Sequence, residues 1–438
     1  MQKEEKSPDW RRMNNETMEQ INKIVPELRF PEFVNDGEWI EEKLGEIAEI
    51  KGRIGYRGYT VADIVSKGQG AITLSPSNFD ENGTLNFEKC TYITWAKYEE
   101  SPEIQLEEGQ TVLVKTASVG KSAYVQNLPE KATVNPQIVV LKSKTIHNKF
   151  LSYCILHDNI QNQIKSCVGA GAIPNLSQDS ISKFKIILPS DKEGIEQQKI
   201  ADCLTSLDEL ITAQTDKLEI IKNHRKGLLQ NLFPQGGLEV PKYRFPEFLN
   251  DGEWKEKELG DKEVAFIVNE KVSVNNLQIE NYISTENMLP NFNGVSIASK
   301  LPSSGKFTYF KIGDILISNI RPYLKKVWKS NKTGGVSNDV FVFRAGSDSH
   351  SNFLEFILKN DAFINYVMKS AKGVKMPRGD RESILKYKVS IPSKFEQQKI
   401  AECLMEVDNL INAQIEKIEQ LNTHKKGLMQ GLFPKVKN

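Results

Sequence analysis

The sequence predicts a mixed α+β protein with an internal pseudo-twofold repeat, in which two tandem α/β domains are joined and spaced by two long helices that form an antiparallel coiled coil. The segment Glu-Gln-Gln-Lys-Ile-Ala occurs at 196–201 and again at 396–401. The segment Gly-Leu-Leu-Gln-Asn-Leu-Phe-Pro at 227–234 returns with two changes at 427–434, at the same offset. Both copies carry apolar residues at heptad spacing, which is the pattern of a coiled-coil seam.

Each long helix is predicted from this seam, in which steps of four and three residues alternate. The proposed spacer residues are Ile200, Leu204, Leu207, Ile211, Gln214, Leu218 and Ile221 in the first helix, and Ile400, Leu404, Val407, Ile411, Gln414, Ile418 and Leu421 in the second. Phe-Pro ends each helix, and at 1.5 Å per residue each is on the order of 50 Å long. Gln214 and Gln414 are the polar residues midway along each seam and are expected to form a polar layer. An antiparallel register centred on this layer pairs Gln214 with Gln414 and Ile200 with Leu428.

The start of each half also repeats. Arg-Phe-Pro-Glu-Phe at 29–33 and Asn-Asp-Gly-Glu-Trp at 35–39 return at 244–248 and 250–254. This offset is larger than that of the helices, so the second half has lost residues between the two motifs. A constant frame that carries two variable modules explains the pattern.

The module interiors share a skeleton. A turn glycine leads into a buried strand at 109–116 and at 313–320, and β-rich runs follow at 134–141 and 336–343. A helix and a returning strand close each module. The predicted division is a loose N-terminal extension at 1–25, a first domain at 26–190, a central helix at 191–236, a second domain at 237–392 and a C-terminal helix at 393–438.

Composition excludes several classes of protein. The formal net charge of +1 argues against coating nucleic acid by bulk charge, although it allows local basic patches. The 5 cysteines form no Cys-x-x-Cys pair, so zinc and a disulfide framework are disfavoured and a reducing cytoplasm fits. The chain shows neither a signal peptide nor an apolar run of membrane-spanning length, so we expect a cytoplasmic protein without a membrane partner.

Basic and hydroxyl-rich loops follow the predicted strands. Arginine can bind guanine edges bidentately, lysine neutralises phosphates, and small residues permit close backbone approach. The candidate nucleic-acid contacts in the first module are Arg53, Tyr56, Arg57, Lys115, Thr116, Ser118, Lys121 and Ser122. Those in the second module are Ser318, Asn319, Arg321, Tyr323, Lys325, Lys326, Lys372, Lys375 and Arg378. Any one of these loops could instead be merely solvated.

Catalytic signals are nearly absent from the sequence. Gly-Ala-Gly at 169–171 lacks the strand–glycines–helix context of a nucleotide fold. Asn-Pro-Gln-Ile at 135–138 lacks the second proline and the aromatic residue of the amino-methyltransferase motif. No P-loop and no nucleophile–base set occur, so we expect no catalytic residue, no metal site and no cofactor bound by this chain.

Taken together, these motifs resemble the specificity subunit of Type I restriction–modification enzymes. The likeness rests on Pro-Glu-Leu-Arg-Phe-Pro-Glu-Phe at 26–33, Gly-Asp-Ile-Leu-Ile-Ser at 313–318, and the Glu-Gln-Gln-Lys-Ile-Ala helix start after each module. The resemblance implies two target-recognition domains, each reading one half of a split double-stranded DNA target. It also implies a non-catalytic subunit on which two methyltransferase subunits and the motor–nuclease subunits assemble. S-adenosylmethionine, ATP and Mg²⁺ would then bind the partners.

Two other functions stay open from the residues alone. One is a self-contained DNA methyltransferase or nuclease with diverged motifs, which would bind S-adenosylmethionine by itself. The other is a coiled-coil scaffold with no role on nucleic acid, which would not shift duplex DNA.

Overall fold

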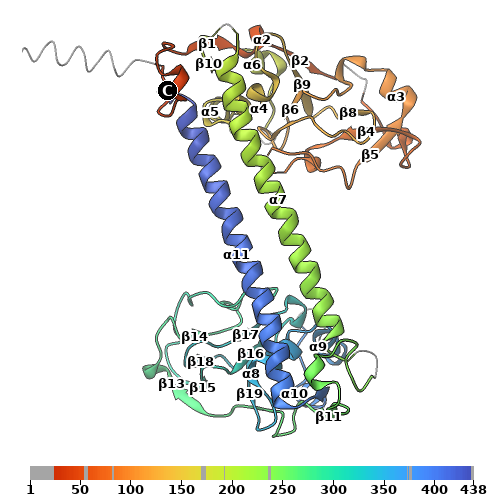
Figure 1. The fold of residues 1–438 in the computed structure, drawn as a ribbon, viewed down its shortest axis with the longest axis vertical. Helices are drawn as coiled ribbons and strands as arrows, with labels where there is room; N and C mark the ends of the chain where they lie inside the picture. The colour runs from red at the N-terminus through yellow and green to blue at the C-terminus, as the bar shows by residue number, and fades with distance from the viewer. Residues whose placement is uncertain are drawn as a thin grey trace, which may run out of the picture. The chain divides into compact units, whose positions relative to one another are not determined.

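The chain forms two compact units. The computed structural model describes residues 24–53, 58–80, 83–168, 174–191, 193–234, 238–371, 373 and 377–435. Unit 1 combines the chain up to Ala213 with the segment from Ile418 onward, and unit 2 is Gln214–Lys417. Each unit holds one α/β domain and a part of both long helices, α7 (Ile195–Asn231) and α11 (Lys394–Leu432), which are green and blue in Figure 1.

The domain of unit 1 contains two four-stranded sheets. One has the order β2 (Ala48–Gly52), β9 (Ile138–Ser143), β6 (Thr111–Val114), β7 (Ser122–Tyr124). The other has the order β3 (Ile64–Val65), β5 (Thr91–Thr94), β4 (Gly70–Leu74), β8 (Ala132–Val134). β1 (Ile40–Lys43) pairs antiparallel with β10 (Lys185–Leu188). The helices are α2 (Leu44–Ile47), α3 (Trp95–Glu99), α4 (Asn148–Leu156), α5 (Asp158–Cys167) and α6 (Gln178–Ser182), and short 3₁₀ turns lie at Pro31–Phe33, Val61–Asp63, Pro76–Asn78 and Pro102–Ile104.

The domain of unit 2 repeats the strand order of the first sheet, whereas in its second sheet the last two strands exchange places. Its sheets have the orders β12 (Ala265–Ile267), β19 (Val340–Ala345), β16 (Ile315–Ser318), β17 (Val327–Lys329), and β13 (Lys271–Ser273), β15 (Lys306–Phe310), β18 (Gly334–Val336), β14 (Tyr282–Ile283). β11 (Lys255–Glu258) pairs with β20 (Lys388–Ile391). The helices are α8 (Ser351–Leu358), α9 (Asp361–Ser370) and α10 (Arg381–Leu385), with 3₁₀ turns at Pro246–Phe248, Val274–Asn276 and Pro322–Leu324. The predicted mixed fold and internal repeat are thus confirmed.

Buried strands explain why the module interiors read as apolar runs. All four residues of β6 and of its counterpart β16 are buried. The predicted turn glycines Gly109 and Gly313 precede these strands with φ of 91° and 87°, in the left-handed region that glycine tolerates best. The predicted helices and returning strands also form, as α4 and β10 in unit 1 and as α8 and β20 in unit 2.

The two long helices pair antiparallel inside each unit, as predicted. In unit 1, Ile200 near the start of α7 lies in one core with Leu428 near the end of α11. In unit 2 the roles are exchanged, and Ile400 shares a core with Leu228. The phenylalanine of each Phe-Pro ending anchors the helix end: Phe433 stacks on Phe150 of unit 1 at 5.4 Å between ring centroids, and the equivalent stack exists in unit 2.

The predicted polar layer sets the register. The Gln414 side-chain amide donates to the side-chain oxygen of Gln214 and to its carbonyl, both at 2.9 Å. Gln414 is only 6% exposed, so its amide is held by protein groups rather than by solvent. A buried polar pair at a seam position penalises shifted alignments, because any shift would leave both amides without partners.

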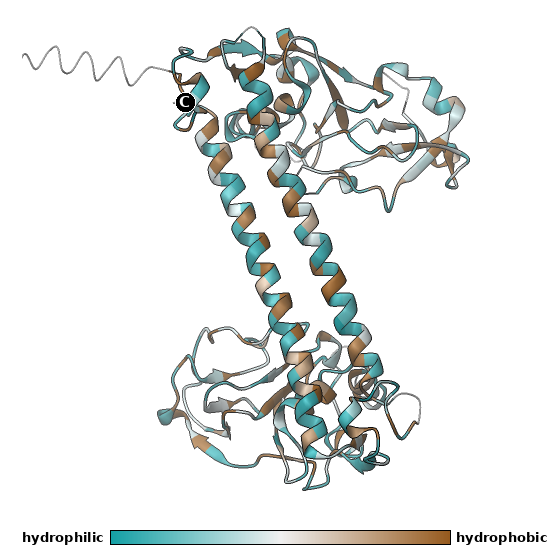
Figure 2. Ribbon diagram, in the orientation of Figure 1, coloured by the Kyte–Doolittle hydropathy of each residue, from teal (hydrophilic) through white to brown (hydrophobic). Residues whose placement is uncertain are grey.

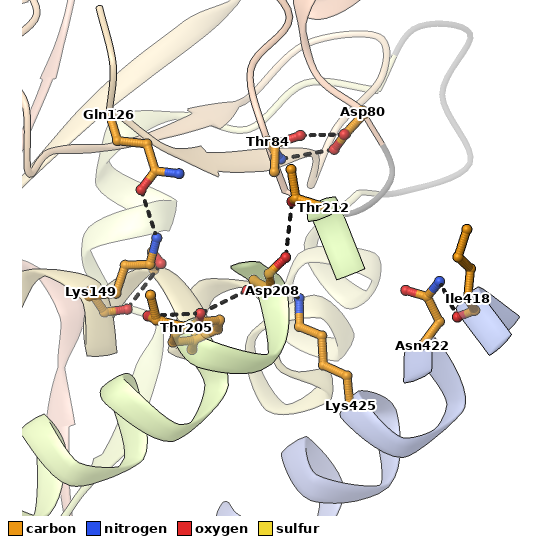
Figure 3. A network of polar contacts seen from close by, with 12 residues as sticks. Asp80, Thr84, Gln126, Lys149, Thr205, Asp208, Thr212, Ile418, Asn422 and Lys425 are labelled. Atoms are coloured by element: carbon orange, nitrogen blue, oxygen red, sulfur yellow. Dashed lines mark hydrogen bonds and ion pairs between the residues drawn. The ribbon is translucent and has the colours of Figure 1, made fainter. Parts of the chain in front are cut away.

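Charged layers flank the amides. In unit 1 the Lys425 ammonium lies 2.6 Å from Asp208 (Figure 3). Asp208 also accepts a hydrogen bond from the Tyr153 hydroxyl at 2.8 Å. In unit 2 the equivalent aspartate, Asp408, pairs with Arg225. The basic residues Arg225 and Lys425 thus each meet an aspartate of the facing helix. Hydrophilic and hydrophobic residues alternate along both helices in Figure 2.

Candidate nucleic-acid interface

The sheet of unit 1 that contains β6 ends in a cluster of loops. Main-chain hydrogen bonds fix them: the Lys115 N–H donates to Gln137 O (2.8 Å), the Ala117 N–H to Pro174 O (3.0 Å) and the Leu176 N–H to Lys115 O (2.8 Å). Residues far apart in the sequence therefore share one edge of the sheet. We call residues 115–121, 135–137 and 174–176 the loop edge of unit 1.

The same frame recurs in unit 2. The Asn319 N–H donates to Asp339 O (2.8 Å), the Arg321 N–H to Pro377 O (2.8 Å) and the Gly379 N–H to Asn319 O (3.0 Å). We call residues 319–326, 337–339 and 377–379 the loop edge of unit 2. Its main chain follows that of unit 1 although the side chains differ in size and charge.

A strained backbone position marks both loop edges. Ala117 has φ of 65° and its counterpart Arg321 has φ of 53°, in the left-handed region that side chains other than glycine rarely adopt. Such a conformation costs about 1–2 kcal/mol per residue. Because strain that surrounding contacts hold in place is concentrated at functional sites, its recurrence at equivalent positions points to this edge in each unit.

The structure gathers four of the eight first-module candidates at the loop edge of unit 1. Ser118 and Lys121 are exposed and Lys115 is half-buried, whereas Ser122 is 2% exposed and lies inside strand β7. The Thr116 hydroxyl is partly exposed and donates to the side chain of Asn175 at 2.8 Å.

Arg53 lies beside the same edge. It follows β2, whose last residue Gly52 pairs with Val139, and its guanidinium donates to Val134 O at 3.2 Å. Burial lowers the pKa of this guanidinium. The candidates Tyr56 and Arg57, like Lys372 and Lys375 of the second module, lie outside the described residues.

In unit 2 the structure separates exposed candidates from those engaged by the protein. Arg321, Tyr323 and Arg378 are exposed at the loop edge. Ser318 is 3% exposed and its hydroxyl donates to Ile320 O, and the half-buried Asn319 supports the edge through its main chain.

Two lysines of this loop are engaged by neighbouring groups. The Lys325 ammonium lies 2.6 Å from Asp361, and the Lys326 ammonium donates to Thr285 O at 2.6 Å. Burial, followed by the like charge of Arg321, lowers the pKa of Lys326. Of the basic run at 321–326, the arginine is therefore the cation best placed to meet a ligand.

Sequence reasoning missed several members of the edge. Gln137 and Asn175 of unit 1 and Asp339 of unit 2 carry polar side chains there, although they lie in segments without a basic cluster. The alignment of 134–141 with 336–343 already placed Gln137 and Asp339 at equivalent positions. Nothing in the sequence shows that these segments meet the loop after β6.

The repeated motifs form the supporting frame rather than the edge. Arg29 binds Glu196 through two hydrogen bonds of 2.7 Å, and Arg244 binds Glu396 through two of 2.8 Å, with every one of these side chains at most 8% exposed. These hydrogen bonds raise the pKa of both arginines. The Arg-Phe-Pro motif is thereby locked to the first turn of the long helix in each unit.

The glutamine after each glutamate joins the same frame to its domain. The Gln197 side chain accepts from the His147 N–H at 3.0 Å, and that of Gln397 accepts from the His350 N–H at 2.8 Å. These bonds reach the start of α4 and α8. The glutamate and the first glutamine of the Glu-Gln-Gln-Lys-Ile-Ala segment therefore have structural roles in both units.

The described side chains offer little to a metal ion. Within the described ranges, no group of three or more His, Cys, Asp or Glu side chains is arranged to hold one. None of the described helices combines the length and apolar character that a membrane span requires.

Comparison with known proteins places this architecture in a family. The model of the Type I restriction modification DNA specificity domain matches residues 37–223 and again 251–421. The specificity subunit of the Type I restriction enzyme MjaVIII from Methanocaldococcus jannaschii is 26% identical over 344 residues, which are 71% of this chain and 76% of that protein. The EcoDI specificity subunit from Escherichia coli is 24% identical over 353 residues, covering 75% and 77%.

A solved structure shows the same fold. The S subunit of a Type I restriction–modification system from M. genitalium matches 94% of this chain and 100% of its own, with a TM-score of 0.56 and 16% identity. The family model matches twice, once over most of each half of the repeat. The chain therefore belongs to the Type I restriction–modification DNA specificity family.

Proposed function

We propose that this chain is the non-catalytic DNA-recognition subunit of a Type I restriction–modification complex and that it reads a bipartite target. The repeated loop edge carries the proposal. One main-chain frame, held by equivalent hydrogen bonds, presents different side chains in the two units. Two equivalent frames suit two half-sites, and different side chains suit two different base sequences.

Local charge supports DNA as the ligand. The chain has a formal net charge of only +1, so attraction to phosphates depends on where the cations lie. Exposed Lys121 and half-buried Lys115 lie at the edge of unit 1, and exposed Arg321 lies at that of unit 2. These side chains would neutralise phosphates beside the bases that the edges contact.

Repeated exposed apolar residues support the binding of two copies of one partner. Ile195 and Phe395 are 55% and 79% exposed at the starts of α7 and α11, beside the buried Arg–Glu pairs. Val34 and Leu249, at equivalent places after the Arg-Phe-Pro motifs, are also exposed. Large exposed apolar groups mark interaction sites, and we assign these to two methyltransferase subunits, which the motor–nuclease subunits then join.

The partners supply the chemistry in this proposal. S-adenosylmethionine would bind the methyltransferase subunits, while ATP and Mg²⁺ would bind the motor–nuclease subunits. The role of this chain is to hold the partners at the target.

Exchange of one module tests the proposal. Residues from about Lys51 to Leu188 are replaced by the corresponding interior of another family member, and the methylomes of cells with the parent, with the chimaera and without this chain are sequenced. We expect one half of the methylated motif to change while the other half and the spacer stay the same. Methylation that is unaffected by removal of the chain would refute the function, and a change in both halves would refute independent reading.

A further inference from the structure

The two loop edges carry chemically different side chains at one equivalent position. Asn175 forms an isolated β-bridge with Thr116 in unit 1, and Arg378 forms the equivalent bridge with Ile320 in unit 2. Both side chains are exposed, and both main chains are fixed by the hydrogen bonds of the loop edge. We propose that this position reads a base in each half-site, Arg378 a guanine and Asn175 an adenine.

The surroundings of Arg378 favour a base over a phosphate. Its side chain is 57% exposed, and its guanidinium forms an ion pair with Asp339 at 3.3 Å. The carboxylate repels a phosphate but leaves guanidinium donors able to reach O6 and N7 of guanine. Asp339 is itself 38% exposed and can accept from N4 of the cytosine paired with that guanine. The pair therefore matches the donor and acceptor pattern of a G·C base pair.

The surroundings of Asn175 favour adenine. The Thr116 hydroxyl donates to the side-chain oxygen of Asn175 at 2.8 Å, which orients the amide. An oriented amide has one further acceptor site and two donors, and asparagine uses this combination to bind N6 and N7 of adenine. Neither Thr116 nor Asn175 carries a formal charge. Their contact with a base therefore adds base discrimination without general attraction to the DNA backbone.

The test rests on the proposed function and uses the full-length chain with its partner subunits. Arg378→Ala, Arg378→Lys and Asn175→Ala are compared with Lys306→Ala, a control on strand β15. Methylome sequencing gives the motif, and binding to duplexes with single base-pair changes gives the affinity at several salt concentrations. Both Arg378 variants should lose one G·C requirement in one half-site and bind the cognate duplex about 5- to 150-fold more weakly. Asn175→Ala should lose an A·T requirement in the other half-site.

Arg378→Lys separates base reading from charge, because it keeps the cation but loses the bidentate fork. A lysine variant with the parental motif, or alanine variants that bind all duplexes equally weakly with a lower salt slope, would show phosphate contact and overturn the inference. Parental motif and affinity in all variants would overturn it as well, while leaving the proposed function intact. If the parent complex itself showed no sequence-dependent binding, the proposed function on which the inference rests would be refuted.

Discussion

Replacing Glu396 by glutamine should open unit 2 locally without affecting unit 1. The carboxylate accepts two hydrogen bonds from Arg244 at 2.8 Å and one from the Trp254 indole N–H at 3.2 Å, and it is 1% exposed. The amide cannot accept on both sides, so a guanidinium that is 8% exposed would face an N–H group without a counter-ion. Breaking a buried ion pair in this way costs about 3–5 kcal/mol.

Hydrogen–deuterium exchange measured by mass spectrometry can detect this cost in each unit separately. At about 1.4 kcal/mol per tenfold, amides near the Arg-Phe-Pro motif and the start of α11 should exchange roughly 10² to 4 × 10³ times faster, provided that they exchange through local opening. Peptides around Arg29 and the start of α7 should not change. Glu196→Gln is the matched variant, with the opposite expected pattern and a smaller cost, because the Trp39 indole N–H has no hydrogen-bond partner among the described residues.

The Arg244→Leu/Glu396→Leu double variant provides the second control. Replacing a buried ion pair by apolar residues of similar volume is often neutral, so the double variant should recover most of the lost protection. A single variant that changes exchange by less than about tenfold, or a double variant as open as the single one, would show that the ion pair does not hold the frame.

Three further predictions concern the seam and the basic loop. Gln214→Leu/Gln414→Leu should raise the thermal unfolding temperature but allow more than one helix register. Disulfide trapping between cysteines introduced on the facing helices would then detect several alignments, and a single alignment would contradict this prediction. Inserting about one heptad into both long helices should lengthen each helix by about 10 Å. The spacer of the methylated motif should then widen by a few base pairs while both half-sites stay unchanged. An unchanged spacer in an active variant would mean that something other than the coiled coil sets the spacer length. The triple variant Arg321→Ala/Lys325→Ala/Lys326→Ala should weaken DNA binding and reduce the dependence of the binding affinity on salt concentration. Arg321→Ala alone should give most of the change in this salt dependence, because both lysines are engaged by other groups of the protein. Normal binding and methylation by the triple variant would show that this surface does not contact DNA.

Local sequence alone determined the repeat, the long helices and their register. Heptad spacing is a property of consecutive residues, and the polar residue midway along each apolar seam indicates the centre of the antiparallel pair. Gln214 could therefore be paired with Gln414 without coordinates. The buried strands after Gly109 and Gly313 were predictable for a similar reason, because an apolar run that follows a turn glycine is a local signal.

Only the tertiary structure decided which distant segments complete the loop edges. Thr116 and Asn175 meet through main-chain pairing of segments that are distant in the sequence, and the left-handed conformation of Ala117 has no local signature such as glycine. The equivalence of Asn175 and Arg378 was hidden because the main chain is kept there while the side chains differ. Lys326 reads as a solvent-facing cation in sequence, yet its ammonium binds Thr285 O. Which way a long side chain turns depends on the acceptors that distant segments bring near it, and only the folded chain supplies that information.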